Sequence, residues 1–150
     1  MLTDECSDSW NDYARKANKG GERMAHINVR YIVDDVDATI AFYTQHLDFI
    51  VKMHPAPSFA ILQRGGLNLL VDAKNGPGGA TQAMPDGRKP EPGGWNRIQI
   101  KVDDLDGFVE TLRKAGLRFR NEIVTGFGGK QILLEDPAGN PIELFETPSK

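Results

Sequence analysis

Val33-Asp34-Asp35-Val36-Asp37 returns as Val102-Asp103-Asp104-Leu105-Asp106, a shift of 69 residues from Val33 to Val102. A stretch with alternating apolar and polar residues precedes each copy, at positions 27–33 and 98–102, and this period is typical of a half-buried β-strand. The aspartates of each copy suit the N-cap of a following helix. The repeat therefore predicts two related modules, each with a strand followed by a helix.

Three short strands are expected after each helix. Their expected ranges are 49–53, 58–63 and 67–71 in the first module and 118–124, 130–135 and 141–145 in the second. Gly65-Gly66 and Asp136-Pro137-Ala138-Gly139-Asn140 supply turns, and Gly116 is a natural C-cap for the second helix. The sequence thus predicts an α+β fold of two tandem βαβββ modules. One helix would cover each four-stranded sheet, leaving the other sheet faces to form a shared cleft.

Composition sets the boundaries of these modules. Residues 1–25 are polar and are interpreted as an N-terminal extension. The folded domain is expected at 26–147, with module one at 26–72 and module two at 95–147. The linker, 73–94, has six glycines and four prolines, which favours a connection over a core element.

Charge and cysteine content exclude several classes of function. The net charge of -3 gives no support to nucleic-acid binding, which would need a basic face. The single cysteine, Cys6, excludes an internal disulfide and fits a reducing cytoplasm. Neither a signal-peptide pattern nor an apolar run long enough to cross a membrane is present in the sequence. We therefore expect a cytoplasmic protein that acts on neither nucleic acid nor membrane.

Two motifs carry a family resemblance. The first repeat runs into Ala41-Phe42-Tyr43 and then His46-Leu47-Asp48-Phe49, and the chain closes on 136–144, Asp-Pro-Ala-Gly-Asn-Pro-Ile-Glu-Leu. From about 27 to 146 the chain resembles vicinal-oxygen-chelate proteins, the superfamily of glyoxalase I, bleomycin-resistance proteins and extradiol dioxygenases. Asp48 departs from the pattern, because a glycine is usual at that turn. The resemblance implies the two-module fold and makes a homodimer a reasonable expectation.

In the metal-dependent members of that superfamily, four ligands come from the first and last strands of the two modules. The resemblance places Asn28, Asn68, Arg97 and Glu143 at these positions. Arginine stays protonated and offers no lone pair, and a single carboxylate supplies little anionic field for a divalent ion. No metal cofactor is therefore expected. The alternative is a metal bound with the help of His26, which has the strand parity of Asn28, together with Glu143.

Without a metal, Arg97 and Glu143 have two interpretations. They can form an ion pair that replaces the lost metal. Alternatively, Arg97 can bind an anionic oxygen while Glu143 accepts a hydrogen bond or moves a proton, which makes both candidate catalytic residues. Strand parity adds the polar neighbours Arg30 and Gln99 and the apolar Phe145. Trp95, just before the first strand of module two, can stack on a planar ligand. The predicted ligand-binding set is Asn28, Arg30, Asn68, Trp95, Arg97, Gln99, Glu143 and Phe145.

Three functions remain open. The sequence favours a metal-free protein of the resistance or sequestering type, whose partner is a small organic ligand with an anionic or polar oxygen. A second possibility is a metal-dependent lyase or dioxygenase of the glyoxalase or extradiol type that uses His26. A third is a metal-free isomerase or epimerase that uses Glu143 and Arg97.

Overall fold

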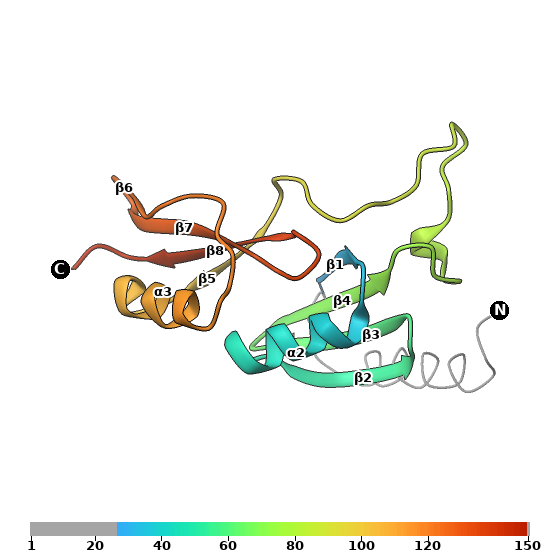
Figure 1. Cartoon of the computed structure of the whole chain (residues 1–150), viewed down its shortest axis with the longest axis horizontal. Helices are drawn as coiled ribbons and strands as arrows, with labels where there is room; N and C mark the ends of the chain where they lie inside the picture. The colour runs from blue at the N-terminus through green and yellow to red at the C-terminus, as the bar shows by residue number, and fades with distance from the viewer. Residues whose placement is uncertain (1–26, 150) are drawn as a thin grey trace, which may run out of the picture. The chain divides into compact units, whose positions relative to one another are not determined.

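The protein is described by a computed structural model that covers residues 27–149. The chain divides into two compact units, and the division falls between Pro92 and Gly93. Each unit has a four-stranded sheet and one α-helix in its described part (Figure 1). The expected α+β fold of two βαβββ modules is therefore confirmed.

Unit one places its four strands in the order β1-β4-β3-β2. Strands β1 and β4 run parallel, and the other neighbours are antiparallel. The elements are β1 (Asn28–Val33), α2 (Val36–His46), β2 (Ile50–Ala56), β3 (Phe59–Arg64), β4 (Leu67–Ala73) and the short 3-10 helix η1 (Gly79–Thr81). Residues Gly65 and Gly66 make the turn between β3 and β4, as expected.

Unit two repeats this topology with the strand order β5-β8-β7-β6. Strands β5 and β8 are parallel, and β7 is antiparallel to both β8 and β6. The elements are β5 (Ile98–Lys101), α3 (Leu105–Lys114), β6 (Val124–Gly126), β7 (Gly129–Glu135) and β8 (Pro141–Glu146). The predicted turn at residues 136–140 joins β7 to β8.

The repeated aspartates begin both helices. The Asp35 side chain accepts a hydrogen bond from the amide of Ala38 at 3.0 Å, and the Asp104 side chain accepts one from Gly107 at 3.1 Å. Each bond satisfies a donor that the first helical turn leaves without an intrahelical partner. The helix ends also agree with expectation, since Gly116 follows α3 with a φ of +82°, a value that glycine adopts without steric cost.

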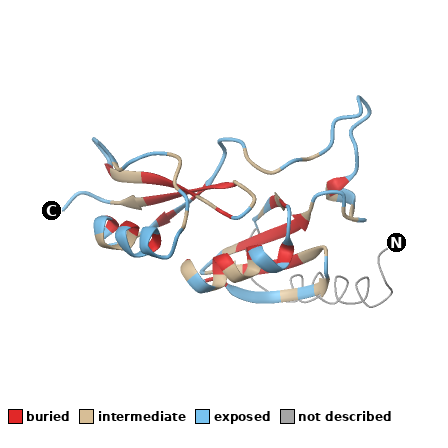
Figure 2. Cartoon of the chain, viewed as in Figure 1, coloured by how far each residue is buried: buried red, intermediate tan, exposed pale blue. Residues whose placement is uncertain are grey.

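Alternation along the strands gives each sheet two different faces. In unit two, α3 buries Leu105, Val109 and Leu112, and the strand residues of apolar parity are buried with them (Figure 2). These strand residues are Ile98, Ile100, Ile132, Leu134, Ile142 and Leu144. The sheet face with the opposite parity, which we call the polar face, carries Gln99, Lys101, Glu143 and Phe145. Unit one is built in the same way, with Asn28, Arg30, Asn68 and Asp72 on its polar face.

One predicted strand was wrong. Residues 118–124 were expected to form a strand, but only a single bridge between Phe119 and Leu134 forms there, and β6 begins at Val124. The Asn121 side chain explains the interruption, because its Oδ1 accepts the hydrogen bond of the Leu133 amide at 2.9 Å. A side chain thus occupies the place of a strand carbonyl, and the ladder cannot continue.

Asp48 lies at the turn after α2 and has a φ of +57°. Side chains with a Cβ rarely adopt this left-handed conformation, and aspartate is among the few that tolerate it. This positive φ explains why a glycine is usual at this turn. The aspartate leaves the fold unchanged, as expected.

None of the helices within residues 27–149 is long and apolar enough to cross a membrane.

Candidate functional site

The polar face of unit two holds the two residues that were expected to carry the chemistry. Strand register places Gln99 of β5 opposite Glu143 of β8, which in turn lies opposite Leu133 of β7. Arg97 directly precedes β5 and, at the parity of Gln99, lies on the same face. The parallel pairing of β5 with β8 therefore brings Arg97, Gln99 and Glu143 together.

Glu143 is 8% exposed, and both of its carboxylate oxygens are bonded. Oε2 accepts a hydrogen bond from Nε of Arg97 at 2.9 Å, and Oε1 accepts one from Nε2 of Gln99 at 2.9 Å. A buried carboxylate needs such partners to offset its loss of hydration. The ion pair between Arg97 and Glu143, which one of the two interpretations predicted, is present.

Arg97 retains donors that the fold does not use. Nε bonds Glu143, and Nη1 donates to the carbonyl oxygen of Trp95 at 3.2 Å. Guanidinium has five N–H donors, and Nη2 has no hydrogen bond to the described residues. The side chain is 30% exposed. Arg97 is thus held by two hydrogen bonds and remains partly exposed.

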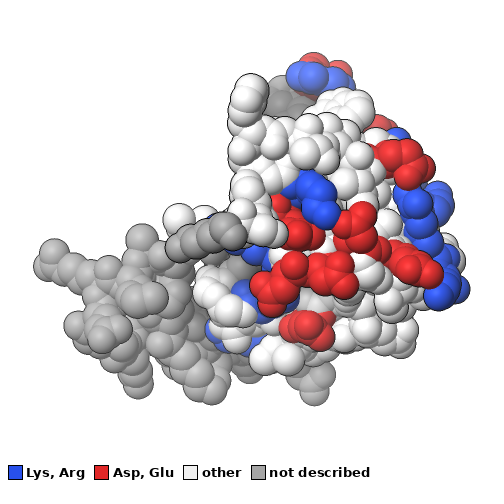
Figure 3. Space-filling model, turned by 90° about the vertical axis from the view of Figure 1, so that its left-hand side faces the viewer, with Lys and Arg blue, Asp and Glu red and all other residues white. Residues whose placement is uncertain are grey.

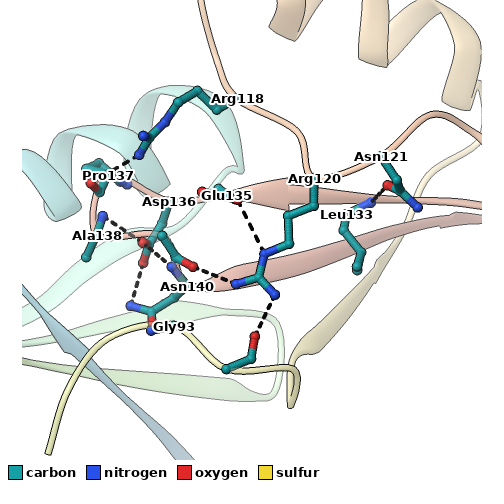
Figure 4. A network of polar contacts seen from close by, with 12 residues as sticks. Gly93, Arg118, Arg120, Asn121, Leu133, Glu135, Asp136, Pro137, Ala138 and Asn140 are labelled. Atoms are coloured by element: carbon teal, nitrogen blue, oxygen red, sulfur yellow. Dashed lines mark hydrogen bonds and ion pairs between the residues drawn. The ribbon is translucent and has the colours of Figure 1, made fainter.

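Trp95 is fixed from the other side by Arg120. The guanidinium carbon of Arg120 lies 4.8 Å from the centroid of the Trp95 ring, within the range of a cation–π interaction. Arg120 also pairs with Glu135 at 3.3 Å and donates to the carbonyls of Gly94 at 2.5 Å and Gly139 at 2.8 Å (Figure 4). The chain around Trp95 is thereby fastened to the turn between β7 and β8.

The turn between β7 and β8 also binds the backbone of Gly93, two residues before Trp95. Asn140 Oδ1 accepts a hydrogen bond from the amide of Gly93 at 2.8 Å, and Asn140 itself donates to Asp136 through its backbone and its side chain (Figure 4). Asp136 and Asn140 are both buried. This polar network sets where the segment that leads to Arg97 begins.

Phe145 shares the strand parity of Glu143 and is half-buried. A Cβ built on Gly129 would lie 3.1 Å from Cζ of Phe145, so the ring packs against the glycines of the turn between β6 and β7. Phe145 is thus an apolar residue on the polar face. It lies two residues after Glu143 on β8.

The polar face of unit one contains two further pairs. Nδ2 of Asn68 donates to Oδ1 of Asn28 at 3.1 Å. Nε of Arg30 lies 3.3 Å from Oδ2 of Asp72 in an ion pair that lacks hydrogen-bond geometry. Burial raises the pKa of Asp72 from its ordinary value, and the positive charge of Arg30 offsets part of that rise.

Strand register corrects the placement of Asn68 at the last-strand position of the first module. Asn28 lies opposite Asn68 and Arg30 opposite Leu70, whereas Gln99 lies opposite Glu143. Because the shift of 69 residues relates Arg30 to Gln99, the counterpart of Glu143 in unit one is Leu70. Asn68 instead corresponds to the residue two positions before Glu143.

These residues do not fit a divalent metal. Arg97 brings a positive charge without a lone pair, and both oxygens of Glu143 already accept hydrogen bonds. Leu70, the counterpart of Glu143, offers no ligand atom. Within residues 27–149, no three histidine, cysteine, aspartate or glutamate side chains cluster closely enough to hold a metal ion. His26, the alternative ligand, lies outside the described residues.

Sequence reasoning missed Asp72 and Arg120. Asp72 shares the parity of Asn68 at a spacing of four in the sequence 67–73, and a strand extended to Ala73 would have placed it on the polar face. Arg120 had no such signal, because its segment was predicted to be a regular strand. Its role depends on the irregular backbone between α3 and β6.

Acidic side chains gather on the face of the molecule drawn in Figure 3. In unit two, Lys130 contacts both Asp106 and Glu146. The hydrogen bond from Lys130 holds the pKa of Asp106 below its ordinary value. This surface agrees with the negative net charge of the chain.

One family model matches most of the chain. The family model described as Glyoxalase/Bleomycin resistance protein/Dioxygenase superfamily matches residues 23–144. Among curated protein sequences, no match is found.

Solved structures share the fold at low sequence identity. A member of the same superfamily from Sphaerobacter thermophilus DSM 20745 has a TM-score of 0.64 and 22% identity, covering 83% of this chain and 99% of that one. TnmS3, an antibiotic binding protein from Streptomyces sp. CB03234, has a TM-score of 0.62 and 19% identity, covering 85% and 99%. Lactoylglutathione lyase from Agrobacterium tumefaciens has a TM-score of 0.61 and 18% identity, covering 85% and 96%.

Proposed function

The chain belongs to the Glyoxalase/Bleomycin resistance protein/Dioxygenase superfamily, and on that premise we propose that it binds a small organic molecule without a metal ion. The ligand would present an anionic or strongly polar oxygen to Arg97. Gln99 and Glu143 would hold the guanidinium in place and set its orientation. The protein would then act by sequestering its ligand.

The observation that carries this proposal is that some donors of Arg97 are bonded within the protein while others remain unused. Its Nε is bonded to a buried carboxylate, while Nη2 has no partner among the described residues and the side chain is partly exposed. A guanidinium fixed in this way loses little rotational freedom when it binds an oxygen. It also keeps paired donors that suit a carboxylate or phosphate.

A relative with this fold supports a binding role. TnmS3 is an antibiotic binding protein, so the architecture serves ligand capture in at least one member. The lyase from Agrobacterium tumefaciens keeps catalysis open as an alternative. Glu143 suits a general base poorly, because Arg97 and Gln99 occupy both of its oxygens.

Binding is tested by thermal shift and calorimetry with a panel of carboxylates and phosphates. A ligand at 100 times its Kd should stabilise the folded protein by about 2.7 kcal/mol. Arg97→Gln should abolish that gain. Arg88→Gln is the matched control, because Arg88 is an exposed arginine of the linker that pairs only with Asp86 in the described structure. Equal losses in both variants would refute the assignment to Arg97.

The metal-free part of the proposal has a separate test. Metal content of the purified protein is measured by mass spectrometry, with thermal-shift titrations of nickel, zinc, manganese, iron(II) and calcium. We expect less than stoichiometric metal and no saturable stabilisation. A saturable shift that disappears in His26→Ala would instead support the metal-dependent lyase or dioxygenase.

A further inference from the structure

Trp95 is a large aromatic residue near the proposed site whose side chain is not part of the hydrophobic core. It is 70% exposed, although a tryptophan in water forgoes a large gain from burial. Its place in the chain is nonetheless well defined. Nη1 of Arg97 donates to its carbonyl oxygen, and the Arg120 guanidinium lies over its ring.

The contacts of Arg120 place the ring on the same side of the sheet as Glu143. Nε of Arg120 pairs with Glu135, which shares the strand parity of Leu133 on β7. Leu133 lies opposite Glu143, so Glu135 and the Arg120 side chain belong to the polar face. A ring stacked on Arg120 therefore lies on that face as well.

Arg120 is a positioning residue and not a second anion site. Its three nitrogens are engaged by Glu135, Gly94 and Gly139, and its side chain is only 16% exposed. One side of the Trp95 ring is thus covered by a fixed cation. Trp95 as a whole remains 70% exposed, and within residues 27–149 no other aromatic ring or guanidinium stacks on its indole.

We infer that Trp95 is a pre-positioned stacking platform that selects planar, conjugated ligands bearing an anionic oxygen. This inference rests on the proposed function, because Arg97 would bind the oxygen while Trp95 stacks on the attached ring. The cation beneath the indole and the hydrogen bond to its carbonyl fix the platform before the ligand arrives. A saturated ligand of equal charge would keep the contact with Arg97 and lose the stacking.

The test compares benzoate with cyclohexanecarboxylate, which carry the same charge and differ in planarity. Ligand-observed NMR titrations give both dissociation constants for the full chain. Benzoate should bind about fivefold more tightly, equivalent to about 1 kcal/mol at 1.4 kcal/mol per tenfold. Trp95→Ala should remove that preference and leave cyclohexanecarboxylate binding within about twofold. Trp95→Phe should retain part of it.

Phe127→Ala is the matched control, because Phe127 is another exposed aromatic residue of unit two and its loss should leave the preference unchanged. A preference that survives in Trp95→Ala would overturn the inference. Uncharged benzamide separates it from the proposed function. Benzamide binding that falls in Trp95→Ala but not in Arg97→Gln supports the platform even if neither carboxylate binds. Failure of all three probes to bind the unsubstituted protein overturns the platform.

Discussion

At the scale of a single residue, substitution of Glu143 distinguishes a binding protein from an acid–base enzyme. Its negative charge neutralises Arg97 and weakens the attraction of that guanidinium for an anion. Glu143→Gln keeps a carbonyl acceptor for Nε of Arg97 but removes the charge. We expect benzoate to bind up to about fivefold more tightly, from roughly 1 kcal/mol of relieved repulsion. Stability should fall by about 1–3 kcal/mol because a charge-assisted bond is lost.

The two quantities are measured by NMR titration and by urea unfolding. An acid–base enzyme would instead lose turnover in Glu143→Gln without any gain in affinity. Gln99→Leu is the companion variant, since it removes the amide that holds Oε1 while leaving the charge of Glu143 in place. Benzoate affinity that fell equally in both variants would contradict the electrostatic explanation.

Asp72 gives a prediction about pH. Burial raises its folded-state pKa above the unfolded value, so the folded protein binds this proton more tightly than the unfolded chain does. The contribution of Asp72 to stability is therefore most favourable at low pH and declines as pH rises through the folded pKa. Asp72→Asn should be more stable than the unsubstituted protein near pH 7, by at most about 1 kcal/mol, and the difference should shrink on acidification.

Arg30 does not cancel this gain, because its side chain is 41% exposed and can be hydrated without its partner. Urea unfolding at a series of pH values provides the measurement. Asp34→Asn is the control, since Asp34 pairs with Lys74 at the surface and its loss should change stability little. An advantage of Asp72→Asn that grew on acidification would show that the sign is wrong.

At the scale of one element, the repeated aspartates differ in what they do. Asp104 accepts a hydrogen bond from the first turn of α3, whereas the adjacent Asp103 has no side-chain hydrogen bond or ion pair with the described residues. Asp104→Ala should therefore lower the free energy of unfolding by about 1 kcal/mol. Asp103→Ala should leave it nearly unchanged. Both are measured by urea unfolding, and equal losses would contradict the capping role.

The elements also show how far the sequence could predict this fold. Alternation and the repeated aspartates predicted β1, α2, β5 and α3, because these signals are local. Register was less accessible, since it depends on which residues face each other across β1 and β4. The pairing of Arg30 with Leu70 could not be read from the motifs that carry the family resemblance. The irregular segment before β6 depends on the Asn121 side chain, and propensity alone does not reveal such a contact.

The site was predictable to a similar degree. Arg97, Gln99 and Glu143 follow from strand parity and a family motif, and the structure brings these three together. The contact between Trp95 and Arg120 joins residues 25 positions apart, with β5 and α3 between them in the chain, and no periodic pattern marks it. The shared cleft between the modules stays a prediction.

At the scale of the whole molecule, the distribution of charge sets how binding should respond to salt. The net charge is -3, and Arg97 is already neutralised by Glu143, so an approaching anion meets no long-range attraction. Raising NaCl from about 10 to 150 mM shortens the Debye length from about 30 Å to about 8 Å. This screening weakens the contact with Arg97 and the repulsion from the acidic surface together. Benzoate affinity measured by NMR titration should therefore change by less than about threefold, and a tenfold fall would mean that the ligand binds an uncompensated basic patch instead.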